Sequence, residues 1–260
     1  MSLDAPAHPD TAGREKLPVI ATCIAGYRSL YDEWDSFVRL AAWPFIWLVA
    51  IQIAGQSLAK LFKAPALASL IDLPYLLLIP FAVAWLRMLM LGERPESFQG
   101  IRFGRTELGF LAYVFLIPLV SYLPAILLGG AALVIREPMV DHVFLLVTTL
   151  LALSGGAYLS MRLWLVFPEI AIDKFNGLSE SWHMAKGAVS RICAIAMIVE
   201  LPLIIIGIPF IFFQAVTGTG LIVNSILQVI LALLSSAVYR AAQATAYRHL
   251  TQGRTEIRAG

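Results

Sequence analysis

Long uncharged runs of apolar residues constrain this sequence more than any other feature. The runs Leu40 to Ala59 and Leu108 to Ile135 contain no charged residue. Each is long enough, at 1.5 Å of helix rise per residue, to cross a hydrocarbon core about 30 Å thick. Charged residues make up 14% of the chain, well below the share of about 25% in soluble domains. The sequence therefore predicts an all-α integral membrane protein.

The apolar runs predict six transmembrane helices, at about residues 40–59, 70–91, 108–135, 143–168, 192–213 and 221–247. The last two come from one apolar stretch, Ile192 to Tyr239, which we divide at Thr217-Gly218-Thr219-Gly220 because such a run favours a turn. Residues 19–250 are expected to form one membrane domain. Residues 1–18 are predicted to be a disordered cytoplasmic tail, and residues 251–260 a second cytoplasmic tail.

The basic residues are distributed unevenly between the predicted loops. Sixteen of the 19 Lys and Arg residues lie at one membrane face, and only Lys60, Lys63 and Arg136 lie at the other. Positive charge is enriched in cytoplasmic loops. This distribution predicts that both termini are cytoplasmic.

Two polar connections have the periodicity of amphipathic helices. Between Val19 and Trp34 the apolar residues recur at helical spacing, with Arg28, Asp32 and Glu33 elsewhere, and residues 178–191 repeat this pattern. We expect these segments to lie as surface helices at the cytoplasmic interface, with Trp and Tyr at head-group depth.

A spacing of 16 residues between a basic residue and a proline occurs three times. The pairs are Arg28 and Pro44, Arg102 and Pro118, and Lys186 and Pro202. Each returning helix then carries one arginine near its cytoplasmic end, at Arg87, Arg162 and Arg240. This pattern predicts three helical hairpins related as internal repeats. The alternative is coincidence, because 14 prolines and 19 basic residues offer many chance matches.

Four residues are candidates for function. Arg87, Arg162 and Arg240 either snorkel to the inner interface or surround a cytoplasmic vestibule that binds anionic lipid head groups. Glu200 lies nine residues beyond Arg191 and so roughly 14 Å into the membrane. We expect it to face the bundle, either as a structural hydrogen-bonded acid or as a proton or cation site in a transporter. Its candidate partners by depth are Gln52, Ser121, Tyr122, Ser154 and Gln228.

No pattern of residues indicates catalysis, a cofactor, a metal ion or a nucleic-acid partner. The four histidines and two cysteines show no ligand spacing, and the sequence has no Gly-x-Ser-x-Gly elbow or phosphate-binding glycine loop. The sequence favours a non-enzymatic scaffold or accessory factor that binds lipid or another membrane protein. The alternative is a transporter or channel for a small solute with a mid-membrane carboxylate.

Two regions of the sequence are distinctive. The first is Trp164-Leu165-Val166-Phe167-Pro168-Glu169-Ile170-Ala171-Ile172-Asp173, followed by Leu178-Ser179-Glu180-Ser181-Trp182 and Lys186-Gly187. The second is the end of the last apolar helix, Tyr247-Arg248-His249-Leu250. In these segments the chain resembles a set of bacterial six-helix membrane proteins. That set includes the membrane domain attached to some glycerophosphoryl diester phosphodiesterases. The resemblance implies a six-helix fold and a bacterial inner-membrane location. It implies no phosphodiesterase activity, because the soluble catalytic domain has no counterpart in this sequence.

Overall fold

The computed structural model describes residues 17–62, 76–94, 104–134, 142–175, 177–217 and 221–259. These residues form helices and the turns between them, with no strand in the described ranges. The helices are α1 (Val19–Asp32), α2 (Trp34–Leu61), α4 (Leu78–Leu91), α5 (Arg105–Val134), α6 (His142–Arg162), α7 (Val166–Ala171), α8 (Leu178–Met184), α9 (Val189–Thr217) and α10 (Leu221–Ala259).

Five segments are long and apolar enough to cross a membrane: Trp34–Leu58, Arg105–Pro124, Thr149–Ala171, Val189–Pro209 and Ile222–Gln252. The chain is therefore a helical, multi-pass membrane protein. These segments correspond to five of the six predicted spans. The remaining one, 70–91, is represented by the 14-residue α4, and its first residues, 70–75, lie outside the described ranges.

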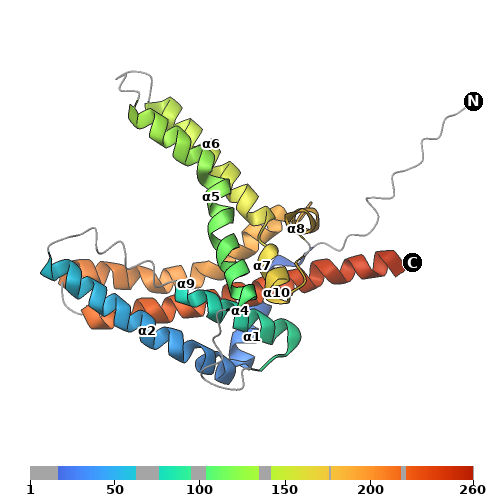
Figure 1. Ribbon diagram of the computed structural model, residues 1–260, viewed down its shortest axis with the longest axis horizontal. Helices are drawn as coiled ribbons and strands as arrows, with labels where there is room; N and C mark the ends of the chain where they lie inside the picture. The colour runs from blue at the N-terminus through green and yellow to red at the C-terminus, as the bar shows by residue number, and fades with distance from the viewer. Residues whose placement is uncertain are drawn as a thin grey trace, which may run out of the picture.

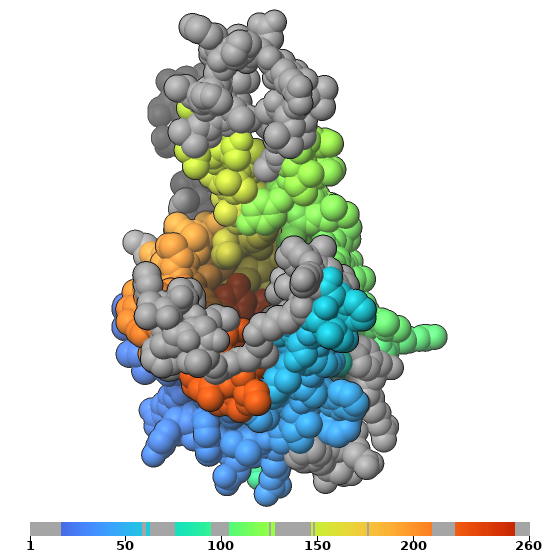
Figure 2. Space-filling model, turned by 90° about the vertical axis from the view of Figure 1, so that its left-hand side faces the viewer, coloured from blue at the N-terminus to red at the C-terminus, as the bar shows by residue number. Residues whose placement is uncertain are grey.

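Helix α10 is the centre of the fold, because α1, α2, α4, α7 and α9 all pack against it. Helices α2 and α9 extend in the same direction beside α10, whereas α5 and α6 pack together and lead away from the other helices (Figure 1). The space-filling view shows this α5–α6 pair standing clear of the layer formed by α2, α9 and α10 (Figure 2). The pair joins the rest of the protein through contacts with α4, α7 and α9.

Helix α4 is buried on two faces and separates two hydrophobic clusters. Phe81 and Trp85 face the larger cluster, which also takes residues from α1, α2, α9 and α10. Val83 and Leu86 face the smaller cluster, which includes residues of α5 and α7. A helix that is apolar all round is expected to be enclosed by other elements. The left-handed conformation of Gly92, with φ +71°, then ends α4 as a C-terminal cap.

Helix α1 forms where the surface helix was predicted, but its apolar residues do not share one environment. Cys23 and Leu30 are buried in the larger cluster, whereas Ile20 and Ile24 are exposed. Gly26 permits this docking, because a Cβ there would lie 3.1 Å from the backbone oxygen of Val238 on α10. One face of α1 is therefore part of the bundle.

Several boundaries differ from the predicted ones. The span 143–168 is interrupted by a turn at residues 163–165, between α6 and α7. The predicted surface helix 178–191 is interrupted by a turn at 185–188, where Gly187 has φ +81°. Helix α10 continues to Ala259, through most of the predicted second tail. Residues 1–16 of the predicted first tail lie outside the described ranges, but Leu17 is buried in the larger cluster.

We predict that Gly156→Ala destabilises the protein while Gly155→Ala does not. A Cβ at residue 156 would lie 2.6 Å from the backbone oxygen of Ser121 on α5, whereas a Cβ at residue 155 would meet open space. Overpacking of this kind costs about 1–3 kcal/mol. Melting temperatures in a mild detergent should show a fall for the first variant alone, and equal values for both would contradict this packing of α5 on α6.

Candidate functional site

The three predicted arginines lie near one level of α10. Trp85, two residues before Arg87, donates its indole N–H to the carbonyl of Ala237 at 2.9 Å. Trp164, two residues after Arg162, donates to the hydroxyl of Tyr239 at 2.6 Å. Because Ala237 and Tyr239 closely precede Arg240, the three arginines lie near one level of α10, and we call them the arginine belt.

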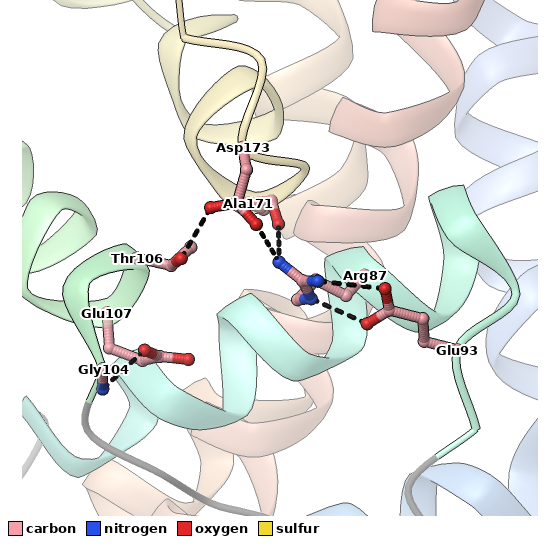
Figure 3. Close-up of polar contacts among 7 residues, drawn as sticks. All are labelled: Arg87, Glu93, Gly104, Thr106, Glu107, Ala171 and Asp173. Carbon is pink, nitrogen blue, oxygen red and sulfur yellow. Dashed lines mark hydrogen bonds and ion pairs between the residues drawn. The ribbon is translucent and has the colours of Figure 1, made fainter.

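Arg87 is held by groups from two directions (Figure 3). Its Nε and one terminal nitrogen bind the two carboxylate oxygens of Glu93, at 2.8 and 2.9 Å. The other terminal nitrogen binds Asp173 at 2.6 Å and the carbonyl of Ala171 at 3.1 Å. Paired donation to one carboxylate is the strongest geometry available to a guanidinium. Arg87 therefore fixes the end of α4 to the segment that follows α7.

Asp173 extends this clasp to α5. Its second carboxylate oxygen accepts a hydrogen bond of 2.7 Å from the hydroxyl of Thr106. The backbone of Asp173 has φ +56°, a left-handed conformation that Asp and Asn adopt more readily than most residues. The hydroxyl of Thr106, and then the guanidinium of Arg87, lower the pKa of Asp173 below its usual range. Nearby, Glu107 accepts from the backbone N–H of Gly104 at 2.8 Å, which is the return half of a capping box at the start of α5.

Arg162 and Arg240 are held mainly by aromatic rings. The guanidinium of Arg162 lies 4.1 Å from the centre of the Trp182 ring and donates to the hydroxyl of Tyr158 at 2.6 Å. The guanidinium of Arg240 lies 5.0 Å from the ring of Phe110 and 4.9 Å from that of Phe167. Cation–π contacts of this length are attractive. The three arginines thus share a level but have different partners.

Glu200 is half-buried between α9 and α10, and its partner is Ser235. The Ser235 hydroxyl lies 2.9 and 2.7 Å from the two carboxylate oxygens. The candidates proposed from depth did not include Ser235. Two of them, Gln52 and Gln228, instead bond to each other at 3.4 Å. Ser235 lies seven residues from Gln228, on nearly the same face of α10 and about 10 Å away along the helix, so the depth estimate selected candidates at the wrong level.

The sequence reasoning also missed the acidic groups near the belt. Neither Glu93 nor Asp173 was among the candidate residues, yet both carboxylates bind Arg87. Glu169, which stands in the Trp164–Asp173 segment, is only 1% exposed. In the sequence, the position of this carboxylate beside a proline in an otherwise apolar segment is the one feature that could have indicated its burial.

Within the described ranges, no three His, Cys, Asp or Glu side chains come together as a metal-binding group. Comparison with known proteins identified no matching family model, no matching curated protein and no matching solved structure.

We predict that Asp173→Asn removes stability at neutral pH but not in acid. Asparagine tolerates the same backbone conformation but cannot supply a carboxylate to Arg87 and Thr106. Because the folded pKa of Asp173 is lowered, its contribution is present above the unfolded pKa of about 3.9 and is lost as the pH falls through the folded pKa. Asp173 is 58% exposed, so solvent screening limits the effect to about 1 kcal/mol, or about 2–4 °C. Melting curves at pH 7 and below pH 4 should show this difference shrink, and a pH-independent difference would contradict the clasp.

We predict that Glu200 and Ser235 are coupled. Glu200→Gln should keep the hydrogen bond and be nearly silent in stability. Glu200→Leu and Ser235→Ala should each destabilise, by about 0.6 kcal/mol or somewhat more for an interhelical bond in a membrane. The double variant Glu200→Leu with Ser235→Ala should cost less than the sum of the single changes. Strict additivity in thermal unfolding would show that the two side chains act independently.

Proposed function

We propose that this chain is a non-enzymatic, six-span protein of the bacterial inner membrane that acts as a scaffold or accessory factor by binding lipid or another membrane protein. The observation that carries this proposal is the pairing of polar side chains across helices. Glu200 pairs with Ser235, Gln52 with Gln228, and Gln56 with Ser225 at 3.5 Å. Each pair joins α10 to α9 or α2, which favours a role in holding helices together over a role in lining a passage.

The proposed topology has three hairpins with both termini in the cytoplasm. Consecutive helices do pack together as α2 with α4, α5 with α6, and α9 with α10, which favours this arrangement. The uneven distribution of Lys and Arg favours the orientation. A basic inner face would also attract anionic lipid head groups, at about 1 kcal/mol for each basic residue near the surface.

A transporter is the second candidate, and Glu200 is the observation that favours it. A half-buried carboxylate deep in an apolar segment is costly, and such residues often mark ion or proton pathways. The scaffold proposal takes the same residue as a structural link between α9 and α10.

Reporter fusions test the topology. Fusions after Gly92, Asn176 and Gly253 should report the cytoplasm, and fusions after Lys63, Pro138 and Thr219 should report the periplasm. A periplasmic signal after Gly253 would overturn the six-span orientation, because an odd number of crossings would then separate the termini.

Ion flux distinguishes the two functions. The purified protein is reconstituted into vesicles that contain a pH-sensitive dye, and an imposed proton gradient is followed over time. The scaffold proposal predicts that the gradient decays as in empty vesicles, for both the native chain and Glu200→Gln. Faster decay that depends on Glu200 would replace this proposal with the transporter.

A further inference from the structure

A groove between α1 and α9 is a candidate ligand site. It has a volume of about 490 Å³, which lies within the usual range for small-molecule sites. Its lining residues are Ile20, Cys23, Ile24, Tyr27, Arg28 and Tyr31 of α1 with Ile198 and Pro202 of α9. The walls are almost entirely apolar, and Arg28 is the one charged residue among them.

Two hydrogen bonds fix the walls of this groove. Tyr27 donates its hydroxyl to the carbonyl of Val199 at 2.7 Å, and the Cys23 thiol lies 3.9 Å from the carbonyl of Ile195. Proline 202 lacks an amide hydrogen, so it leaves the helix bonding of this turn incomplete. The bond from Tyr27 anchors α1 at that turn. The groove is therefore built into the fold and is not a gap between loose helices.

The groove extends from the level of the arginine belt toward the membrane interior. Helix α1 crosses α10 at Gly26, beside Val238 and Ala242, which is the level of the belt. Ser235, the partner of Glu200, precedes Arg240 by five residues, so Glu200 lies about 7 Å from the belt along α10. Pro202 lies two residues beyond Glu200 on α9. In the proposed orientation, the groove thus runs from the level of the arginine belt, where Gly26 of α1 meets α10, to Pro202 deeper in the membrane.

The charges beside the groove specify the head group. Arg28 Nε lies 3.4 Å from the carboxylate of Asp32, and the two side chains are 78% and 56% exposed. Exposed pairs of this kind contribute little to stability, so both charges are accessible to a ligand. A guanidinium is well suited to bind a phosphate, and the carboxylate one turn away is suited to an ammonium group. A purely anionic head group would instead meet the repulsion of Asp32.

We propose that this groove binds an aminophospholipid with a zwitterionic head group: the acyl chain lies along Ile24, Ile198 and Pro202, the phosphate contacts Arg28, and the ammonium contacts Asp32. Tyr31, which is 82% exposed, and Trp34, which is 50% exposed, are residue types enriched at the membrane interface. This inference rests on the proposed lipid-binding function and names its site and its ligand class.

The test is lipid binding to the full-length protein, measured by native mass spectrometry. Phosphatidylethanolamine and phosphatidylglycerol with identical acyl chains are added to protein stripped of lipid in detergent. At the groove, whose share of the binding is what Ile198→Trp removes, the native chain should prefer phosphatidylethanolamine by about tenfold. Ile198→Trp should fill the groove and abolish this preference. Ile205→Trp is the matched control, because Ile205 is 58% exposed on the same helix and does not line the groove.

Two charge variants test the head-group contacts without filling the groove. Arg28→Gln should weaken binding of both lipids, because both carry a phosphate. Asp32→Asn should weaken phosphatidylethanolamine alone and raise phosphatidylglycerol. Equal effects of Ile198→Trp and Ile205→Trp, or a larger loss of phosphatidylglycerol than of phosphatidylethanolamine in Ile198→Trp, would overturn the groove site while leaving general lipid binding intact. Failure to bind either lipid would overturn the lipid-binding function as well.

Discussion

Polar groups in a hydrocarbon core must find partners inside the protein, and in this fold α10 supplies most of them. Six groups along α10 bond to side chains or carbonyls of α2, α9, α4 and the turn that follows α6. They are Ser225, Gln228, Ser235, the carbonyl of Ala237, Tyr239 and Gln243. Interhelical hydrogen bonds in membranes average only about 0.6 kcal/mol. Their main effect is therefore to determine which helix lies beside α10 and in which register, more than to add large stability.

Close backbone contacts determine the remaining pairs. Without a hydrophobic driving force between helices in lipid, association depends on packing and on small residues at the interface. Gly26 brings α1 onto α10, and Gly156 brings α6 onto α5. The α5–α6 pair has such a contact within itself, but among the side chains that the structure describes it has no series of polar links to α2 or α9 like those of α10. This difference explains why the pair leads away from the other helices beyond its junction with α4 and α7.

Hydropathy predicted the apolar helices well because length and lack of charge are local properties of the chain. The prolines at residues 44, 118 and 202 do lie within α2, α5 and α9. The partner of Glu200 was not predictable from counting residues alone, since Ser235 and Gln228 lie on nearly the same face of α10 and differ by about 10 Å in depth. The clasp on Arg87 was missed for a similar reason: Asp173 is far from it in sequence and reaches it through a left-handed turn.

The kinds of polar contact change in order along α10. Near Arg240 lie full charges, with Arg87 bound to two carboxylates. Five residues earlier, Ser235 meets the single carboxylate of Glu200, and near Gln228 and Ser225 the contacts are between neutral amides and hydroxyls. Ser225 lies 15 residues from Arg240, or about 22 Å of helix. Since a charge costs more as it moves from the interface toward the bilayer centre, this order favours placing the arginine belt at an interface and the neutral pairs within the span. That argument places the belt at an interface from contacts between helices, without the count of basic residues in the loops.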